Sequence, residues 1–251
     1  LRAAWNVSFA AEASANSNRS YGQALLDLVK AFEKIPHHLL VAAAVKHGYS
    51  LILLRLSLAA YRCLRTLVDN KVCSRLILAV CGITAGSGTA TTELRMLVLD
   101  VIAQSYVLFP TISLFVFVDD FTIEFAGNYF SVAWHLARAT DFIVDFFETM
   151  LMLEVSVEKS IVIGCTPKLA KAVCSASKTR KVKPASSGKL LGVPSAGGRR
   201  RVVKHLVKRL SSFRQKVGRI HDLRRLGVRT NNVVRAAGTP AITYGVEVTG
   251  M

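Results

Sequence analysis

The sequence predicts an α+β fold, because short strand-like runs alternate with longer helix-like stretches along its 251 residues. Two strand-like apolar runs, 22–28 and 113–118, carry or lead into carboxylates. Apolar residues recur at helical spacing in several of the stretches between and after these runs. Hydrophobic residues make up 51% of the chain, so most of it is expected to fold around a core.

The first half of the chain is expected to begin with an irregular segment, 1–20, whose residues are small and polar without clear periodicity. A strand over 22–28 holds Asp27, and Ile35-Pro36 then interrupts the chain. The elements that follow are helices over 39–47 and 51–67, loosely alternating strands over 72–80, a glycine-rich loop over 82–89 and a helix over 91–103.

The second half is expected to begin with a hairpin, because two β-branched and aromatic runs, 113–118 and 121–125, flank Asp119-Asp120. After it we expect a long helix over 131–153, a strand-like run over 155–163, a basic loop over 167–188 and a short strand over 189–193. The last helix carries an apolar stripe at helical spacing, formed by Val202, Val203, Leu206, Leu210, Phe213, Val217 and Ile220.

The positive charge is concentrated at the C-terminal end. Residues 168–251 contain 20 Lys and Arg against two acidic residues, whereas residues 1–167 contain 13 against 14. A charge run is usually a solvated face, but an excess this uneven favours a polyanion such as nucleic acid as partner. The near-neutral part is then the candidate catalytic body.

The cysteines indicate neither a disulfide framework nor a zinc site, because their number is odd and no Cys-x-x-Cys pair occurs. We expect Cys63, Cys73, Cys81, Cys165 and Cys174 to be reduced intracellular thiols, mostly in the core. The chain starts without Met or a signal-peptide pattern, which suggests a fragment.

A membrane-spanning helix is the least favoured interpretation of the uncharged stretch 101–118. The stretch contains Gln104, Ser105 and Pro110, and it runs directly into two carboxylates. A helix, a break at Pro110 and then a buried strand explain it better.

The carboxylates in apolar surroundings point to a metal site. Asp27, Asp119 and Asp120 are costly to bury unless something compensates their charge. If they converge, bound divalent cations are the simplest explanation. The alternative for Asp119-Asp120 is an ordinary hairpin turn, a position that suits Asp.

The order of these motifs resembles the palm of a reverse transcriptase, most closely the non-LTR (LINE-type) retrotransposon branch and more distantly group II intron enzymes. Asp27-Leu28-Val29-Lys30-Ala31-Phe32-Glu33 with His37-His38-Leu39-Leu40 is similar to the first palm motif of the family. Phe117-Val118-Asp119-Asp120 stands for the Tyr-Ala-Asp-Asp box, and two later boxes resemble 153–159 and 190–193. The glycine loop keeps Gly82 and Gly86 but has Thr84 and Ala85 where the family has Pro and Gln.

The resemblance implies the roles of the site residues. Asp27 and Asp119 would hold two Mg²⁺ ions, or Mn²⁺ in their place, with Asp120 contributing peripherally, and Lys159 would protonate the leaving pyrophosphate. Phe32 would exclude a 2′-hydroxyl and so select deoxynucleotides, the plain alternative being core packing. Nucleotide binding would extend to Gly86 and Ser87, and the primer grip to Leu191 and Gly192. The residues implied in contacts with template–primer phosphates are Arg199, Arg200, Arg201, Lys204 and Lys208.

The implied function is RNA-directed DNA polymerase activity, with an RNA template, a DNA primer and dNTPs as partners and a location inside the cell, in the nucleus. The expected domains are a truncated fingers remnant at 1–24, a palm with part of the fingers at 25–193, and a basic helical thumb-like segment at 194–251. The main alternative is a catalytically inactive retrotransposon remnant that still folds and binds nucleic acid. The altered glycine loop and the few residues before Asp27 favour that alternative, whereas the retained carboxylates oppose it.

Overall fold

The computed structural model describes residues 2–70, 72–84, 86–198 and 202–244, and it is built on a five-stranded sheet in the order β4-β5-β1-β6-β7. The central strand β1 pairs antiparallel with both β5 and β6, and β6 pairs parallel with β7. Strand bounds are Ser20–Leu26 for β1, Ser113–Phe117 for β4, Asp120–Gly127 for β5, Ile161–Gly164 for β6 and Lys183–Ala185 for β7.

One face of the sheet is covered by long helices. Alternate residues of β1, Ala24 and Leu26, belong to the large core on this face, where α6 contacts β1 and β5 and α7 contacts β6. These helices are α5 (Ala90–Leu108), α6 (Tyr129–Asp145) with the π-helical η1 (Phe146–Met150), and α7 (Pro167–Ala176).

The opposite face is covered by α1 (Arg2–Asn16) and by the small hairpin of β8 (Gly188–Leu190) and β9 (Val193–Ser195). Leu25 of β1 packs there against Ala4 and Val7 in a smaller core. The expectation of an irregular 1–20 is therefore wrong. Moreover, the expected boundary between residues 24 and 25 falls inside β1.

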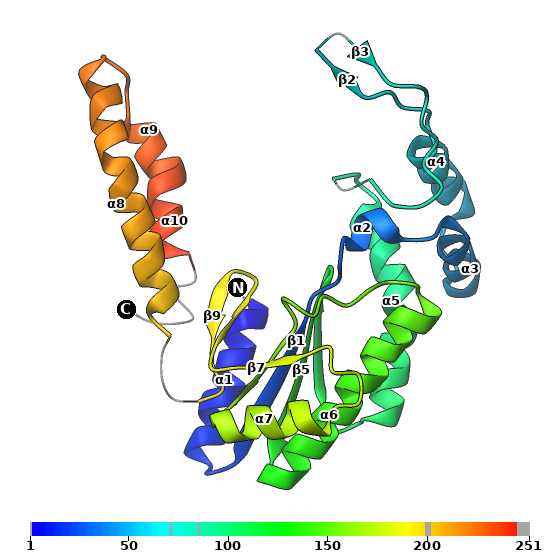
Figure 1. Ribbon diagram of the computed structural model, residues 1–251, viewed down its shortest axis with the longest axis vertical. Coiled ribbons are helices and arrows are strands. Elements are labelled where there is room, and N and C mark those ends of the chain that lie inside the picture. The colour runs from blue at the N-terminus through cyan, green and yellow to red at the C-terminus, as the bar shows by residue number, and fades with distance from the viewer. Residues whose placement is uncertain (1, 71, 85, 199–201, 245–251) are drawn as a thin grey trace.

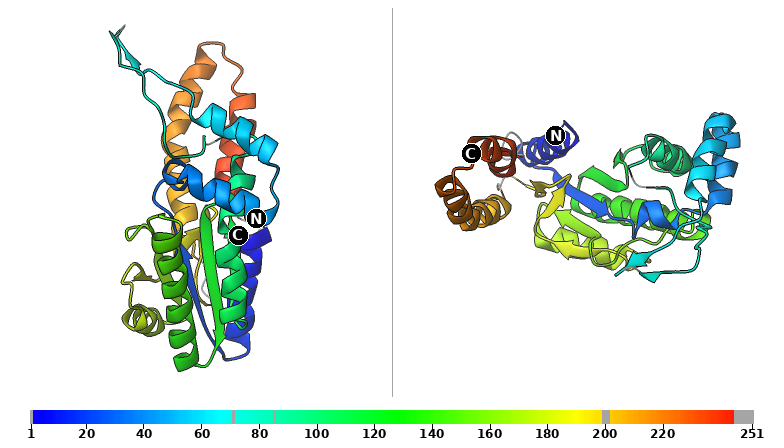
Figure 2. Two further views of the ribbon diagram at one scale, coloured as in Figure 1. Left: turned by 90° about the vertical axis from the view of Figure 1, so that its right-hand side faces the viewer. Right: turned by 90° about the horizontal axis from the view of Figure 1, so that it is seen from above.

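Two projections leave the same end of the sheet on opposite sides (Figures 1 and 2). One consists of α2 (Ala31–Lys34), α3 (His37–His47), α4 (Leu51–Tyr61), β2 (Val68–Asp69) and β3 (Val72–Cys73). The other, which we call the C-terminal hairpin, consists of α8 (Lys204–Arg225), α9 (Asn231–Val233), the π-helical η2 (Val234–Gly238) and α10 (Thr239–Thr243).

Several local expectations hold. The predicted hairpin is β4–β5, and the helix over 91–103 is the longer α5, which ends at Leu108 before Pro110. Other elements are shorter than expected. The helix expected over 51–67 ends at Tyr61, the helix expected over 131–153 passes into η1 after Asp145, and the strand expected over 155–163 is confined to β6.

The apolar stripe of the last helix is only partly buried. Among the side chains that the structure describes on α8 none is fully buried, and Val217 remains 43% exposed. The reason is that α8 packs mainly against α10 and η2, which cover only part of its surface.

The cysteines also differ from expectation. All five thiols are free, but Cys63, Cys73 and Cys81 are exposed, and only the half-buried Cys165 and Cys174 pack against the large core. In the described part of the chain, no helix combines the length and apolar character needed to cross a membrane.

Candidate active site

Asp27 and Asp120 lie beside each other at the ends of two neighbouring strands. The β1–β5 register pairs Leu26 with Phe121. Asp27 comes directly after Leu26, and Asp120 comes directly before Phe121, so the two Asp residues are neighbours across the strands. Both carboxylates line one cavity of about 400 Å³ together with Lys159 and Lys189. Residues far apart in sequence are thus brought to the same edge of the central sheet.

The segment before β6 wraps around Asp27 and fixes its backbone. Ser156 N–H donates to the Asp27 carbonyl at 2.8 Å, and Asp27 N–H donates to Ser160 Oγ at 3.1 Å. Lys159 lies in the turn between these serines, rather than on a strand as expected, and its Nζ donates to Asp27 Oδ1 at 3.2 Å. Because the Lys159 side chain is 70% exposed, this ion pair is a weak, solvent-screened contact.

Burial of Asp120 is the largest electrostatic effect at the site, and repulsion from neighbouring carboxylates adds to it. Burial, followed by the negative charges of Asp119 and Asp27, raises the pKa of Asp120, and the Lys159 ammonium opposes the shift. Asp119 and Asp27 therefore lie close enough to Asp120 to disfavour the ionisation of Asp120. Added positive charge at this position would relieve that repulsion.

Asp119 lies in the turn of the β4–β5 hairpin, since Phe117 pairs with Asp120 and only Val118 and Asp119 connect them. Val118 has φ 59°, a left-handed conformation that is costly for a β-branched residue. Asp119 is absent from the described residues that line the cavity beside Asp27. The structure thus gives Asp120, rather than Asp119, the position opposite Asp27.

The donor set suits a hard divalent cation, because carboxylate oxygens are the ligands that Mg²⁺ prefers. Lys159 already brings a positive charge to Asp27. Among the described residues, however, no group of three or more His, Cys, Asp or Glu side chains is arranged to hold a metal. Metal binding by Asp27, Asp119 and Asp120 stays a prediction.

Backbone hydrogen bonds join the segment that contains Phe32 to the glycine loop. Phe32 is half-buried against the large core, and its carbonyl accepts a hydrogen bond from Ile83 N–H at 2.6 Å. Gly82 N–H donates to the Ile35 carbonyl at 2.7 Å. Gly82 has φ 95°, and a Cβ there would lie 2.7 Å from the Glu33 carbonyl oxygen, so only glycine fits.

The rest of the loop meets a buried polar cluster that sequence reasoning missed. Gly86 is exposed at φ 88°, whereas Ser87 Oγ lies 3.1 Å from Thr89 Oγ1 and accepts from the Tyr61 hydroxyl at 3.4 Å. Tyr61 also donates to Glu93 Oε2 at 2.8 Å. Glu93 is fully buried, and a lone Glu among the apolar residues of the predicted helix was the signal available.

Leu191 and Gly192 form the tight turn of the β8–β9 hairpin, with φ values of 50° and 78°. The Tyr244 hydroxyl donates to the Leu191 carbonyl at 2.7 Å. The Arg209 guanidinium of α8 donates to the Gly192 carbonyl and, at 2.6 Å, to the Tyr244 carbonyl. The turn is therefore tied to the C-terminal hairpin through Arg209 and Tyr244, which the sequence did not single out.

The basic residues expected to contact phosphates are only partly observed. Lys208 lies on α8 and is exposed. Arg199, Arg200 and Arg201 lie outside the described residues, and so does the side chain of Lys204.

No family model matches the sequence, and no curated protein matches it. Among solved structures, this chain is similar to an apo telomerase from Candida tropicalis truncated from its C-terminal domain, with a TM-score of 0.54 and 11% sequence identity. The match covers 78% of this chain and 38% of the telomerase chain. The two chains share a fold. At this identity the likeness concerns the fold alone, a mixed α+β architecture of a polymerase-like kind.

Proposed function

We propose that the chain is the reverse transcriptase domain of a non-LTR (LINE-type) retrotransposon, an RNA-directed DNA polymerase. The observation that carries the proposal is the meeting of Asp27 and Asp120 at the ends of antiparallel central strands. The fold shared with telomerase, a polymerase related to reverse transcriptases, supports it. The sheet with its helices would be the palm, α2–α4 part of the fingers, and the C-terminal hairpin the thumb.

The acidic residues would hold divalent cations, Mg²⁺ or Mn²⁺, at Asp27, Asp119 and Asp120. When bound, the ions would supply positive charge for the attacking primer 3′-oxygen and the departing pyrophosphate of a dNTP. Lys159 would hold a proton close to Asp27 and would donate it to the pyrophosphate, because its ammonium is exposed and paired with the Asp27 carboxylate.

The neighbouring elements would position the substrates. Phe32, packed under the glycine loop, would contact the sugar and favour deoxynucleotides, with Gly86 and Ser87 beside the nucleotide. Leu191 and Gly192 would grip the primer end. The phosphates of an RNA template–DNA primer duplex would be contacted by Arg199, Arg200, Arg201, Lys204 and Lys208. A nuclear location is part of the same proposal.

A second candidate is a catalytically inactive remnant that folds and binds nucleic acid. Two observations favour it. The glycine loop has Thr84 in place of the family's Pro, and no three described His, Cys, Asp or Glu side chains are arranged to hold a metal ion. Such a remnant would keep the basic surface and bind nucleic acid, but it would not extend a primer.

Primer extension on an RNA template decides between the two candidates. The chain should extend a DNA primer with dNTPs in Mg²⁺ or Mn²⁺. Asp27→Asn and Asp120→Asn should each lower the rate by at least about 100-fold, since metal stabilisation supplies several kcal/mol and each 1.36 kcal/mol is tenfold. Asp69→Asn, at an exposed residue of β2, should leave the rate unchanged. Duplex binding without any extension would favour the remnant.

A further inference from the structure

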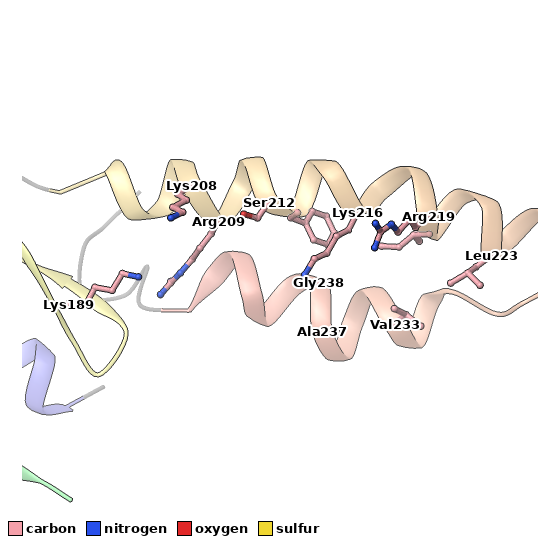
Figure 3. A pocket seen from close by; sticks show the side chains of 12 residues that line it. Lys189, Lys208, Arg209, Ser212, Lys216, Arg219, Leu223, Val233, Ala237 and Gly238 are labelled. Atoms are coloured by element: carbon pink, nitrogen blue, oxygen red, sulfur yellow. The ribbon is translucent and has the colours of Figure 1, made fainter. Parts of the chain in front are cut away.

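The C-terminal hairpin contains a groove between α8 and the segment formed by α9 and η2. The groove encloses about 450 Å³. Its floor is apolar and includes Phe213, Ile220 and Val233. Figure 3 shows side chains of α8 pointing across the groove towards Val233 and Gly238. A Cβ on Gly238 would lie 2.7 Å from the Phe213 ring, so this contact closes the bottom of the groove.

The rim of the groove is cationic. Lys208, Lys216 and Arg219 line it from one face of α8, and no described lining residue is acidic. In the part of the chain that the structure describes, none of these three cations has an ion-pair partner. The helix rises by about 16 Å between the first and the last of them, which suits several successive phosphates. The groove therefore fits an anion that repeats along its length and carries an apolar body.

The groove and the candidate active site share a lining residue. Lys189 of β8 lines both the carboxylate cavity and the groove, and Figure 3 places it at the end of the groove next to Arg209. Arg209 ties the β8–β9 turn to α8, so the two cavities are held in a fixed relation. A strand leaving the carboxylates would meet Lys189 first and the α8 cations next.

We propose that this groove binds a single strand of nucleic acid, with an unpaired base on the apolar floor and neighbouring phosphates on the rim. The proposal rests on the proposed function for the chemistry of the occupant. A groove of about 450 Å³ has room for one base with its sugar on the apolar floor. Contact of bases with an aromatic floor tolerates any sequence, so binding depends on the strand being unpaired rather than on its sequence.

The test compares matched sets of substitutions on one helix. The groove set is Lys208→Gln, Lys216→Gln and Arg219→Gln. The control set is Arg214→Gln, Arg224→Gln and Arg225→Gln, which removes the same charge from α8 residues outside the groove lining. The probes are fluorescein-labelled dT12 and a blunt 12-base-pair duplex, and the measurement is fluorescence anisotropy over a salt series, with circular dichroism as a check of folding.

We expect the groove set to weaken dT12 binding about tenfold more than the control set. Its salt slope should fall by about 2, from three phosphate contacts of about 0.7 each. Ala237→Glu, which adds a carboxylate to the groove, should weaken dT12 binding as well, whereas Ala236→Glu just outside it should not. This pair decides the matter if the triple substitution fails to fold.

Equal losses for the groove and control sets would overturn the proposal. Binding would then depend on the total positive charge of α8 and not on the position of the charges in the groove. Equal losses for dT12 and the duplex would also overturn it. So would competition by poly-glutamate as strong as competition by unlabelled dT12, because the occupant of the groove would then be an acidic protein segment. The two proposals fail separately. Groove-dependent dT12 binding without primer extension refutes only the polymerase function, and extension without groove-dependent binding refutes only this inference.

Discussion

Glu124 makes the stability of the protein depend on pH in a predictable way. It lies on β5 opposite Gln23 of β1, on the sheet face that α1 and the β8–β9 hairpin cover, and it is only 3% exposed. Its Oε1 and the hydroxyl of Tyr21 have no hydrogen-bond partner among the described residues. Burial raises the pKa of Glu124 from 4.5 to about 7, although the nearby Tyr21 hydroxyl opposes the shift.

The sign of the effect follows from linkage. Between pH 4.5 and about 7 the folded protein holds a proton on Glu124 that the unfolded chain releases, so the free energy of unfolding falls as pH rises. The penalty is complete above pH 7 and absent below pH 4.5. A shift of this size corresponds to about 3 kcal/mol. Glu124→Gln removes the titration, so its stability relative to wild type should rise by about that amount between pH 4.5 and pH 8.

Urea unfolding followed by circular dichroism at several pH values between 4.5 and 8 measures this change. Glu12→Gln is the control, because Glu12 is an exposed residue of α1, which covers the same face of the sheet. It should follow the wild-type curve. If Glu124→Gln differs from wild type by a constant amount at every pH, Glu124 is not the buried titrating group and the reasoning is refuted.

Three further outcomes are expected. Tyr61→Phe should cost about 1.5–3 kcal/mol in urea unfolding, because it removes a donor to the buried Glu93 carboxylate, whereas Tyr106→Phe, with only a 3.4 Å bond, should cost far less. Gly82→Ala should cost about 1–3 kcal/mol through its positive φ and its contact with Glu33, and Gly88→Ala in open space should not. In single-nucleotide extension, Phe32→Ala should raise ribonucleotide use roughly tenfold or more with little loss of deoxynucleotide use; unchanged discrimination would return Phe32 to a role in core packing.

Local sequence patterns predicted the fold best where one short segment decides the structure. The β4–β5 hairpin follows from alternation around two Asp residues, and the end of α5 follows from Pro110. α1 was missed because its buried residues, such as Ala4 and Ala11, are small and give a weak hydrophobic period. α7 was missed because lysines interrupt its apolar residues, although Thr166 and Pro167 form a clear helix start.

For the candidate site, the sequence predicted which strands carry the carboxylates but not which of the carboxylates lie next to each other. The sequence placed Asp27 and the Asp119-Asp120 pair at the ends of apolar runs, but the register decides which carboxylate faces Asp27. Only Val118 and Asp119 connect β4 to β5, so Asp120 lies on the strand and Asp119 lies in the turn. The Tyr61–Glu93 and Arg209–Tyr244 contacts join residues 32 and 35 positions apart, a separation at which local periodicity carries no information.

The charges of the molecule are arranged so that the carboxylates are poorly compensated within the chain itself. The raised pKa of Asp120 records unfavourable burial and repulsion from Asp119 and Asp27, and the one ammonium that opposes it belongs to the largely exposed Lys159. A structural ion pair would instead be closely packed and desolvated on both sides. The burial of Asp120 in this state lowers the stability of the folded chain, and added positive charge would offset the cost. The α8 cations that line the groove together with Lys189 have no acidic partner among the described lining residues. Both halves of the charge distribution are thus left open, acidic at the sheet edge and basic along the groove, as a polyanion carried past bound cations would require.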